Sequence, residues 1–379
     1  MAFEHIKKFT RGTTTPLASI FGSGFLVIVS ILAGAVGAYS LIAMAGICAL
    51  AYMVGSVIRY NITHAEPVLG SPNAPVSTRF FERIADIALV PAYVISVTLY
   101  LRILSSYGLG FLKSDTEYNE RCLTTAIILF ILFVGVTKGL KVLEGLEKWA
   151  LYTTMAIIAL LISAFALYDI NIFVNHSLQL PAFPAQGPWH SIAVLAGTLI
   201  VVQGFETTRY LGDEYDAETR IRACRNSQII STVVYLLFVA LATPLMHFLS
   251  SDVSDNALMN LAGIVAVWLP TPLVLAAVFS QFSAATADTI GASGNMLEFS
   301  KHKITEKLSY IIICGFAVLL TWTADTLQIL VLASRAFAFY YFMQCLVAFS
   351  VAQRPIHRVG FTVLGAVLLF ITLFAVPVG

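Results

Sequence analysis

Apolar runs of about 20 residues recur from Leu17 to the C-terminal end of the chain, and each is long enough to cross a bilayer as a helix. Lipid offers backbone groups no hydrogen-bond partner, so spans of this kind must be helices that bond internally. The composition agrees, because 58% of the residues are hydrophobic and 11% are charged, against about 25% charged in soluble domains. The sequence therefore predicts an all-α polytopic membrane protein.

The runs predict about eleven spans in one transmembrane domain that covers residues 1–379. Counts of ten or twelve spans fit the same pattern. Residues 1–15 are too polar for a signal peptide, so the first run is expected to remain as a span. The expected spans are Leu17–Val36, Tyr39–Arg59, Ile84–Leu109, Leu123–Val136, Leu146–Tyr168, Ile192–Leu211, Ile229–Leu249, Leu269–Leu297, Leu308–Ala324, Leu327–Ala352 and Val359–Val378.

Lysine and arginine gather in alternate loops, which predicts the orientation of the chain. Cytoplasmic loops carry the excess of basic residues, so the N-terminus is expected in the cytoplasm and the chain in the plasma (inner) membrane. The basic segments hold Lys7, Lys8, Arg11, Arg79, Arg83, Lys138, Lys141, Lys148, Arg220, Arg222, Arg225, Lys301, Lys303, Lys307, Arg354 and Arg358.

Two of the runs contain a glycine-centred interruption. The first holds Gly22-Ser23-Gly24, and the sixth holds Gly204 followed by Glu206. Glycine lets the backbone leave the helix, and freed backbone groups survive in a membrane where they line a cavity. A carboxylate at this depth costs roughly 2.5–3.5 kcal/mol, which a partner, water or a proton can offset. Close helix packing is the competing reason for glycine in such positions.

The two interruptions occupy corresponding positions in two sets of five spans. Residues 13–170 would form the first repeat, residues 190–353 the second, and residues 359–378 an extra span. Transporters built from inverted repeats have discontinuous helices that meet at the bilayer midplane in this way. Half-helix N-termini present amides to anions there, and half-helix C-termini present carbonyls to cations.

These motifs resemble those of the amino acid–polyamine–organocation (APC) superfamily. Phe21-Gly-Ser-Gly-Phe25 is similar to the family's first-helix motif, and Gln203-Gly-Phe-Glu206 to its sixth-helix signature. The resemblance implies a leucine-transporter-like 5+5 inverted repeat and secondary active transport of an amino acid or related amine by alternating access. The chain departs from the family in its short length and in lacking an obvious twelfth span.

The resemblance also implies a solute site between the two interruptions. A carboxylate would bind the amides of Gly22, Ser23 and Gly24. The amine would meet carbonyls at Ile200 and Gln203. Residues around the second interruption complete the expected site, namely Gly204, Phe205 and Glu206.

The eighth span resembles that of sodium/solute symporters through the run from Phe282 to Ser293. By this resemblance Ser283 and Thr286, with the carbonyls of Ala18 and Phe21, would hold Na⁺, since oxygen ligands suit a hard cation. The competing interpretation is that the two hydroxyls bond to carbonyls of their own helix. Proton coupling through Glu206 is the alternative to sodium coupling, and no other cofactor is expected.

Two further charges lie inside predicted spans, Asp288 in the eighth and Arg335 in the tenth. An unpaired arginine in lipid is costly, so we expect Arg335 to pair with Asp288 or Glu206. Such a pair would serve either transport or the clamping of helices.

Other classes of function find no support in the sequence. The net charge is +1 with no basic patch, so no nucleic-acid partner is expected. The five cysteines are scattered and form no metal or disulfide pattern. No motif of a metal, nucleotide or acyl-transfer enzyme occurs, so we do not expect an enzyme. The partners are expected to be a small solute and the bilayer, and the sequence leaves the oligomeric state open. A membrane sensor built on the same fold is the alternative to a transporter.

Overall fold

The structure is a computed structural model, and it describes residues 2–140, 145–175, 179–182, 187–212, 214–249, 254–301 and 303–378. Side chains are described in these ranges except at 2–11, 23, 145–148 and 299. Within the described ranges the chain is helical and has no β-strand. Nine helices in this part are long and apolar enough to cross a membrane. The predicted all-α polytopic class is confirmed.

The helices follow one another with short connections. Their bounds are α1 Ala2–Ser23, α2 Ile28–Val36, η1 Gly37–Tyr39, α3 Ser40–Tyr60, the π-helical η2 Asn61–Ala65, α4 Glu66–Leu69, α5 Val76–Phe111, α6 Glu117–Lys138, α7 Gly145–Val174, α8 Pro188–Ala196, η4 Leu199–Val202, η5 Phe205–Tyr210, α9 Ala217–Ala242, η6 Thr243–Leu249, α10 Ala257–Val265, α11 Pro270–Phe299, α12 Glu306–Thr323, α13 Thr326–Val351 and α14 Pro355–Phe374.

Several helices extend beyond their apolar runs because polar residues begin them. Helix α5 starts at Val76, directly after Pro75, whose extended backbone ends the preceding turn. Helix α9 starts at Ala217 because the Asp216 side chain accepts a hydrogen bond from the backbone of Thr219. The short helix α10 lies where the sequence predicted a loop. Hydropathy locates the part of a helix inside lipid and misses its capped polar ends.

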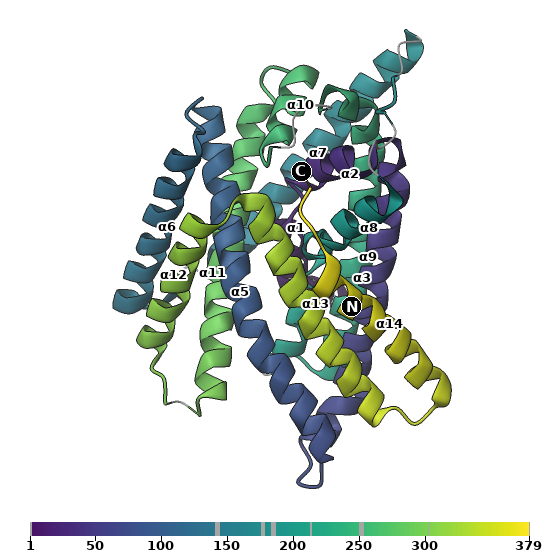
Figure 1. Cartoon of the computed structure of the whole chain (residues 1–379), viewed down its shortest axis with the longest axis vertical. Coiled ribbons are helices and arrows are strands. Elements are labelled where there is room, and N and C mark those ends of the chain that lie inside the picture. The colour runs from purple at the N-terminus through teal and green to yellow at the C-terminus, as the bar shows by residue number, and fades with distance from the viewer. Residues whose placement is uncertain are drawn as a thin grey trace.

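The long helices pack in two groups (Figure 1). Helix α9 packs against both α1 and α3, and α5, α6, α11 and α12 form the other group. Helix α5 packs along both α11 and α13, and α13 in turn packs against α14. The two groups meet where α1 packs against α11. Helix α7, which belongs to neither group, contacts both α9 and α11.

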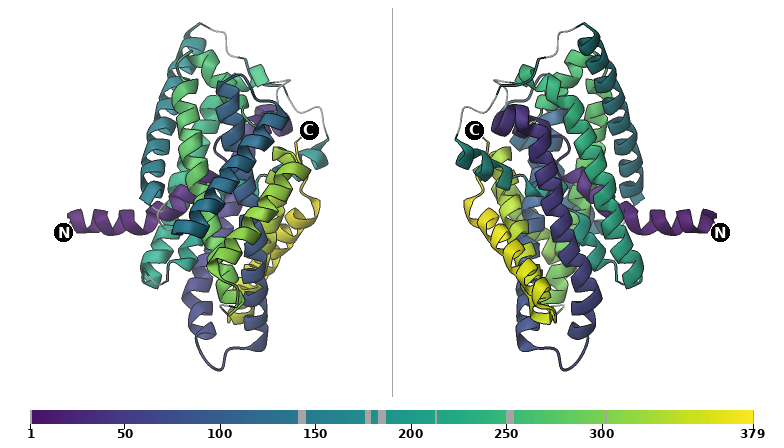
Figure 2. Two further views of the ribbon diagram at one scale, coloured as in Figure 1. Left: turned by 90° about the vertical axis from the view of Figure 1, so that its left-hand side faces the viewer. Right: turned by 90° about the vertical axis from the view of Figure 1, so that its right-hand side faces the viewer.

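Both predicted interruptions are present. Helix α1 ends at Ser23 and α2 begins at Ile28, with a turn between them. The sixth run breaks into α8 and two short 3₁₀ helices, η4 and η5, which Gln203 and Gly204 separate. The N-terminal part of α1 projects from the side of the bundle, and its C-terminal part enters the bundle (Figure 2).

Candidate functional site: a cavity beside two broken helices

Glycine lets the two interruptions contact each other directly. A Cβ at Gly24 would lie 2.6 Å from Cγ2 of Val201 in η4. A Cβ at Gly204 would lie 2.7 Å from the backbone nitrogen of Ile20, and Gly204 has a φ of 127° that L-residues rarely adopt. Both explanations for these glycines therefore apply. Gly24 and Gly204 allow close packing, and Gly204 also adopts a backbone conformation outside the helix.

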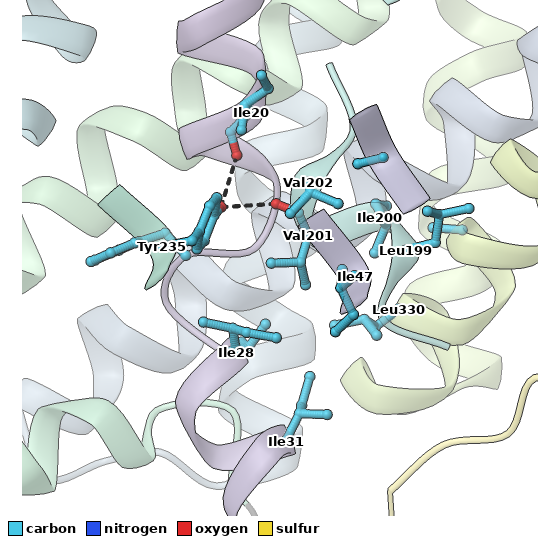
Figure 3. Close-up of a cluster of buried hydrophobic side chains, with 14 of the residues drawn as sticks. Ile20, Ile28, Ile31, Ile47, Leu199, Ile200, Val201, Val202, Tyr235 and Leu330 are labelled. Atoms are coloured by element: carbon cyan, nitrogen blue, oxygen red, sulfur yellow. Dashed lines mark hydrogen bonds between the residues drawn. The ribbon is translucent and has the colours of Figure 1, made fainter. Parts of the chain in front are cut away.

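A tyrosine of α9 joins the two interruptions (Figure 3). The hydroxyl of Tyr235 points between the carbonyl oxygens of Ile20 and Val201. It donates to Ile20 at 3.2 Å and to Val201 at 2.8 Å. A second buried tyrosine, Tyr107 of α5, donates to the carbonyl of Leu26 in the turn after Gly24, at 2.8 Å. Carbonyls released from the helix ends thus find donors on neighbouring helices.

The second interruption is satisfied in the same way. Ser334 of α13 accepts from the backbone N–H of Ile200 at 3.1 Å and donates to the carbonyl of Gly197 at 2.6 Å. Oε2 of Glu206 accepts from the N–H of Gly204 at 2.8 Å and from the hydroxyl of Tyr341 at 2.7 Å. Side chains of the protein therefore use much of the backbone polarity that we expected to meet a solute.

An open cavity of about 630 Å³ lies beside the first interruption, within the usual size of small-molecule sites. Helices α1, α7 and α11 form its wall together with Tyr93 of α5 and the end of η5. Its lining residues run from buried ones near Gly22 to exposed ones near Glu298. The principal polar and aromatic lining residues are Thr14, Thr15, Ser19, Tyr93, Thr154, Thr207, Tyr210, Glu214, Tyr215, Ser280, Ser283, Thr286, Asp288, Asn295 and Glu298.

The described wall of the cavity is acidic. Its charged residues are Glu214, Asp288 and Glu298, and no lysine, arginine or histidine lines it. Asp288 is the deepest of the three, with 5% of its surface exposed. Its Oδ2 has no hydrogen-bond partner among the described residues. A cavity of this kind favours a positively charged group.

The structure brings some of the predicted site residues together at this cavity. Ala18, Phe21, Gly22, Ser283, Thr286 and Asp288 line it. The expected sodium ligands therefore share one wall. The hydroxyl of Thr286, however, donates to the carbonyl of Phe282 on its own helix at 2.9 Å, and Ala18 lies inside regular α1, whose carbonyls are used within the helix.

The remaining predicted solute ligands lie outside the wall. They are Gly24, Ile200, Gln203, Gly204, Phe205 and Glu206, all buried in the contact between the two interruptions. The amide of Gln203 donates to the hydroxyl of Tyr100 at 3.1 Å, and the ring of Phe205 stacks on Tyr341 at 5.5 Å. The side chain of Ser23 lies outside the described ones. The residues expected on α1 and α11 thus border the cavity, apart from Gly24, whereas those expected on the sixth run lie in the contact between the two interruptions. Their roles in binding stay predictions.

The predicted pairing of Arg335 with Asp288 or Glu206 is wrong. Its Nε donates to the carbonyl of Ala375 at 3.0 Å, and its Nη2 bonds to the same oxygen. The segment after α14 also bonds to α8 through the N–H of Val376 and the carbonyl of Ala193. A backbone carbonyl that follows the last span therefore takes the role expected of a carboxylate.

A buried polar network at the other end of η5 was missed at the sequence level. Arg209 bonds to Glu82 of α5 at 2.5 Å and to the side-chain oxygen of Gln344 in α13. Arg220 of α9 binds both carboxylate oxygens of Glu66 and donates to the carbonyl of Arg209. The position of Arg209 next to an interrupted helix could have indicated a buried ion pair. Its network was missed because Glu66 and Glu82 fell in a predicted loop between two spans.

Helices that are interrupted beside a solute-sized cavity are a recurring feature of membrane transporters. The chain belongs to a family described as APC superfamily transporter, whose pattern matches residues 4–375. An uncharacterized protein of Aquifex aeolicus strain VF5 is 38% identical over 379 residues, covering 98% of this chain and 92% of the relative.

Solved structures of similar fold include two mutants of the Eremococcus coleocola manganese transporter. Both have a TM-score of 0.60 and cover 96% of this chain and 85% of their own. They are 13% and 12% identical to it, so the likeness concerns the fold. The family and the fold together identify an integral membrane transporter.

Proposed function

We propose that this transporter moves a small amine-bearing solute, an amino acid or a related amine, across the plasma membrane by alternating access, as an ion-coupled symporter rather than an enzyme. The observation that carries the proposal is the acidic cavity beside the interrupted α1, of about 630 Å³. Cavities of this size suit small organic solutes, and a wall whose described charged groups are carboxylates suits a solute that carries an ammonium group.

The direction in which the cavity opens supports an inward-open form. Its exposed end holds Glu214 and Glu298, which adjoin the basic segments that begin at Arg220 and Lys301. Basic segments lie on the cytoplasmic side. At the opposite end Ser106 of α5 bonds to Asp255 at 2.6 Å, ahead of α10. The cavity would therefore exchange with the cytoplasm while the outer end is held closed.

The two groups of helices support a rocking mechanism with eleven spans in a 5+5 inverted repeat. The group of α1, α3 and α9 contains α1, which belongs to the first interruption, and α9, which packs against η5 of the second. The group of α5, α6, α11 and α12 lies opposite. Alternating access in such folds is a rigid rotation of one group against the other. Na⁺ at Ser283 and Thr286, or a proton on a carboxylate of the cavity, would couple this rotation to an ion gradient.

Transport of a metal cation is the competing function, because the similar solved structures are of manganese transporters. Manganese favours a set of carboxylate, carbonyl and water ligands. The described residues contain no group of three or more His, Cys, Asp or Glu side chains that could hold a metal. We therefore favour the organic solute.

Uptake by proteoliposomes tests the proposed function. Radiolabelled amino acids, diamines and ⁵⁴Mn²⁺ would each be offered to the purified protein under an imposed Na⁺ or H⁺ gradient. Concentration of an amine-bearing solute against its gradient is the expected result. Uptake of manganese alone would favour the competing function. Binding of an amine without uptake in any gradient would favour a membrane sensor.

A matched pair of variants ties uptake to the cavity. Ala287 is an exposed residue of α11 that lines the cavity, and Ala49 is an exposed residue of α3 that does not. Ala287→Trp should fill the cavity and abolish uptake, whereas Ala49→Trp should preserve it. Equal uptake by both variants would show that the solute passes elsewhere.

A further inference from the structure

We propose that Asp288 is the subsite for the ammonium group of the solute. Asp288 lies on the face of α11 that borders the cavity, one turn from Ala284 and one turn from Gly291. It sits deep in the cavity, whereas Glu298 on the same face lies at its exposed end. The inference deepens the proposed function, since it assigns the group that recognises the charge of the solute.

The first argument is that one oxygen of the Asp288 carboxylate lacks a hydrogen-bond partner among the described residues. Asp288 is 95% buried, and its Oδ2 has no donor among the described residues. Ionisable groups inside a membrane protein pair with one another or face a pathway. Arg335 bonds to the carbonyl of Ala375 instead. Glu206 is close enough to act on Asp288 electrostatically, but it has the same sign of charge.

The second argument is the aromatic ring of Tyr93, which lines the same cavity as Asp288. Gly291 follows Asp288 by one turn of α11, and a Cβ there would lie 3.2 Å from the ring of Tyr93. The missing side chain lets Tyr93 approach α11, and this ring also lines the cavity. Asp288 and the Tyr93 ring therefore border the same cavity. An ammonium group in that cavity can be attracted by the carboxylate and by an aromatic ring.

The third argument concerns the size of the cation. A bare metal ion needs several oxygen ligands at close range, whereas Asp288 is the single deeply buried carboxylate of the described wall. The cavity of about 630 Å³ leaves room for the body of an organic molecule attached to its ammonium group.

Thermal stabilisation of the purified full-length protein tests the inference with solutes that differ in the amine alone. The pairs are alanine and lactate, leucine and its 2-hydroxy analogue, and cadaverine and pentanediol. The wild type should be stabilised by at least one amine and not by the matched alcohol. Asp288→Asn should lose roughly tenfold to hundredfold in affinity, as expected for a hydrogen bond to a charged group.

Asp169→Asn is the matched control. Asp169 lies in α7 outside the cavity, and its Oδ1 likewise has no described partner. This variant should bind amines as the wild type does. Asp288→Ser provides a second removal of the charge, and the thermal midpoint without solute reports whether each variant is folded.

Three results would overturn the inference. They are equal binding of amine and alcohol by the wild type, unchanged amine affinity in both Asp288 variants, and no amine binding by the wild type. Because transport is measured separately, amine binding that requires Asp288 but gives no uptake would keep this subsite and reject the proposed transport function.

Discussion

Gly204 is the residue that both interruptions depend on. Its φ of 127° turns the chain between η4 and η5, and its missing side chain lets Ile20 of α1 approach. Its N–H is taken up by the carboxylate of Glu206. One position thus combines a backbone conformation, a close contact and a hydrogen bond, which other residue types cannot reproduce.

Gly204→Ala should therefore destabilise the protein strongly. The backbone strain alone is worth about 1–3 kcal/mol, and the added Cβ would lie 2.6 Å from Oγ of Ser19. The measurement is the thermal midpoint in detergent, with uptake as a second readout. Gly46→Ala in α3 is the control, because a Cβ there meets nothing within 4 Å. Equal midpoints for the two variants would contradict the packing described for Gly204.

Tyr235 offers a second test at this scale. Tyr235→Phe removes the hydroxyl that serves the carbonyls of Ile20 and Val201 and leaves the ring in place. Loss of a partner for a buried polar group costs about 1–3 kcal/mol, so the unfolding midpoint should fall. Tyr152→Phe, at a side chain that is 59% exposed, should leave the midpoint unchanged. An unchanged midpoint in Tyr235→Phe would mean that water replaces the hydroxyl.

At the scale of the elements, η5 forms an ion pair with α5 of the opposing helix group. Arg209 of η5 reaches Glu82 of α5, and Arg220 of α9 holds the carbonyl of Arg209. The contact therefore joins the group of α1, α3 and α9 to α5. A rotation of one group against the other would have to stretch or break this pair.

Breaking the Arg209–Glu82 pair should cost more than breaking a surface pair. Arg209→Gln or Glu82→Gln leaves a charge with little water around it, since the two side chains are 5% and 18% exposed. We expect a loss of roughly 3 kcal/mol for each single variant and less than the sum for the double variant. Titration with a denaturing detergent measures these differences.

The exposed pair of Arg222 and Glu218 in α9 is the reference for that experiment. Its side chains are 58% and 72% exposed, so the same glutamine substitutions should each cost less than about 1 kcal/mol. Additive losses at Arg209 and Glu82 would show that the two charges do not interact in the folded protein.

Across the whole molecule, the sequence predicted what depends on local physics. Lipid fixes the length of an apolar run, and glycine beside an intramembrane polar residue marks an interruption, so the break near Gly22 and that at Gly204 were predicted. Partners far apart in the chain were not. Arg335 donates to the carbonyl of Ala375, and Tyr235 donates to the carbonyl of Val201. Both bonds depend on how the helices pack, which the hydropathy of the sequence does not encode. Ser283 and Thr286 of the cavity wall were expected as sodium ligands through a resemblance, and that ion site stays a prediction.

The access of each end of the molecule to water gives the last prediction. An inward-open form exposes the cavity to the cytoplasm and shields the outer contact of Ser106 with Asp255. Cysteines placed on a Cys122→Ala background report this, since the other four native cysteines are buried. Asn295→Cys in the cavity should react with a membrane-impermeant thiol reagent from the cytoplasmic side and not from the outside.

Two further cysteines calibrate the labelling. Glu117→Cys, at the exposed start of α6, should react from the outside alone, which fixes the orientation of the chain in the membrane. Ser106→Cys should resist the reagent from both sides, because Ser106 is fully buried. Reaction of Asn295→Cys from the same side as Glu117→Cys would reverse the direction of opening. Addition of a transported solute should raise the reactivity at Ser106→Cys if the outer end opens during the cycle, since alternating access requires each end to open in turn.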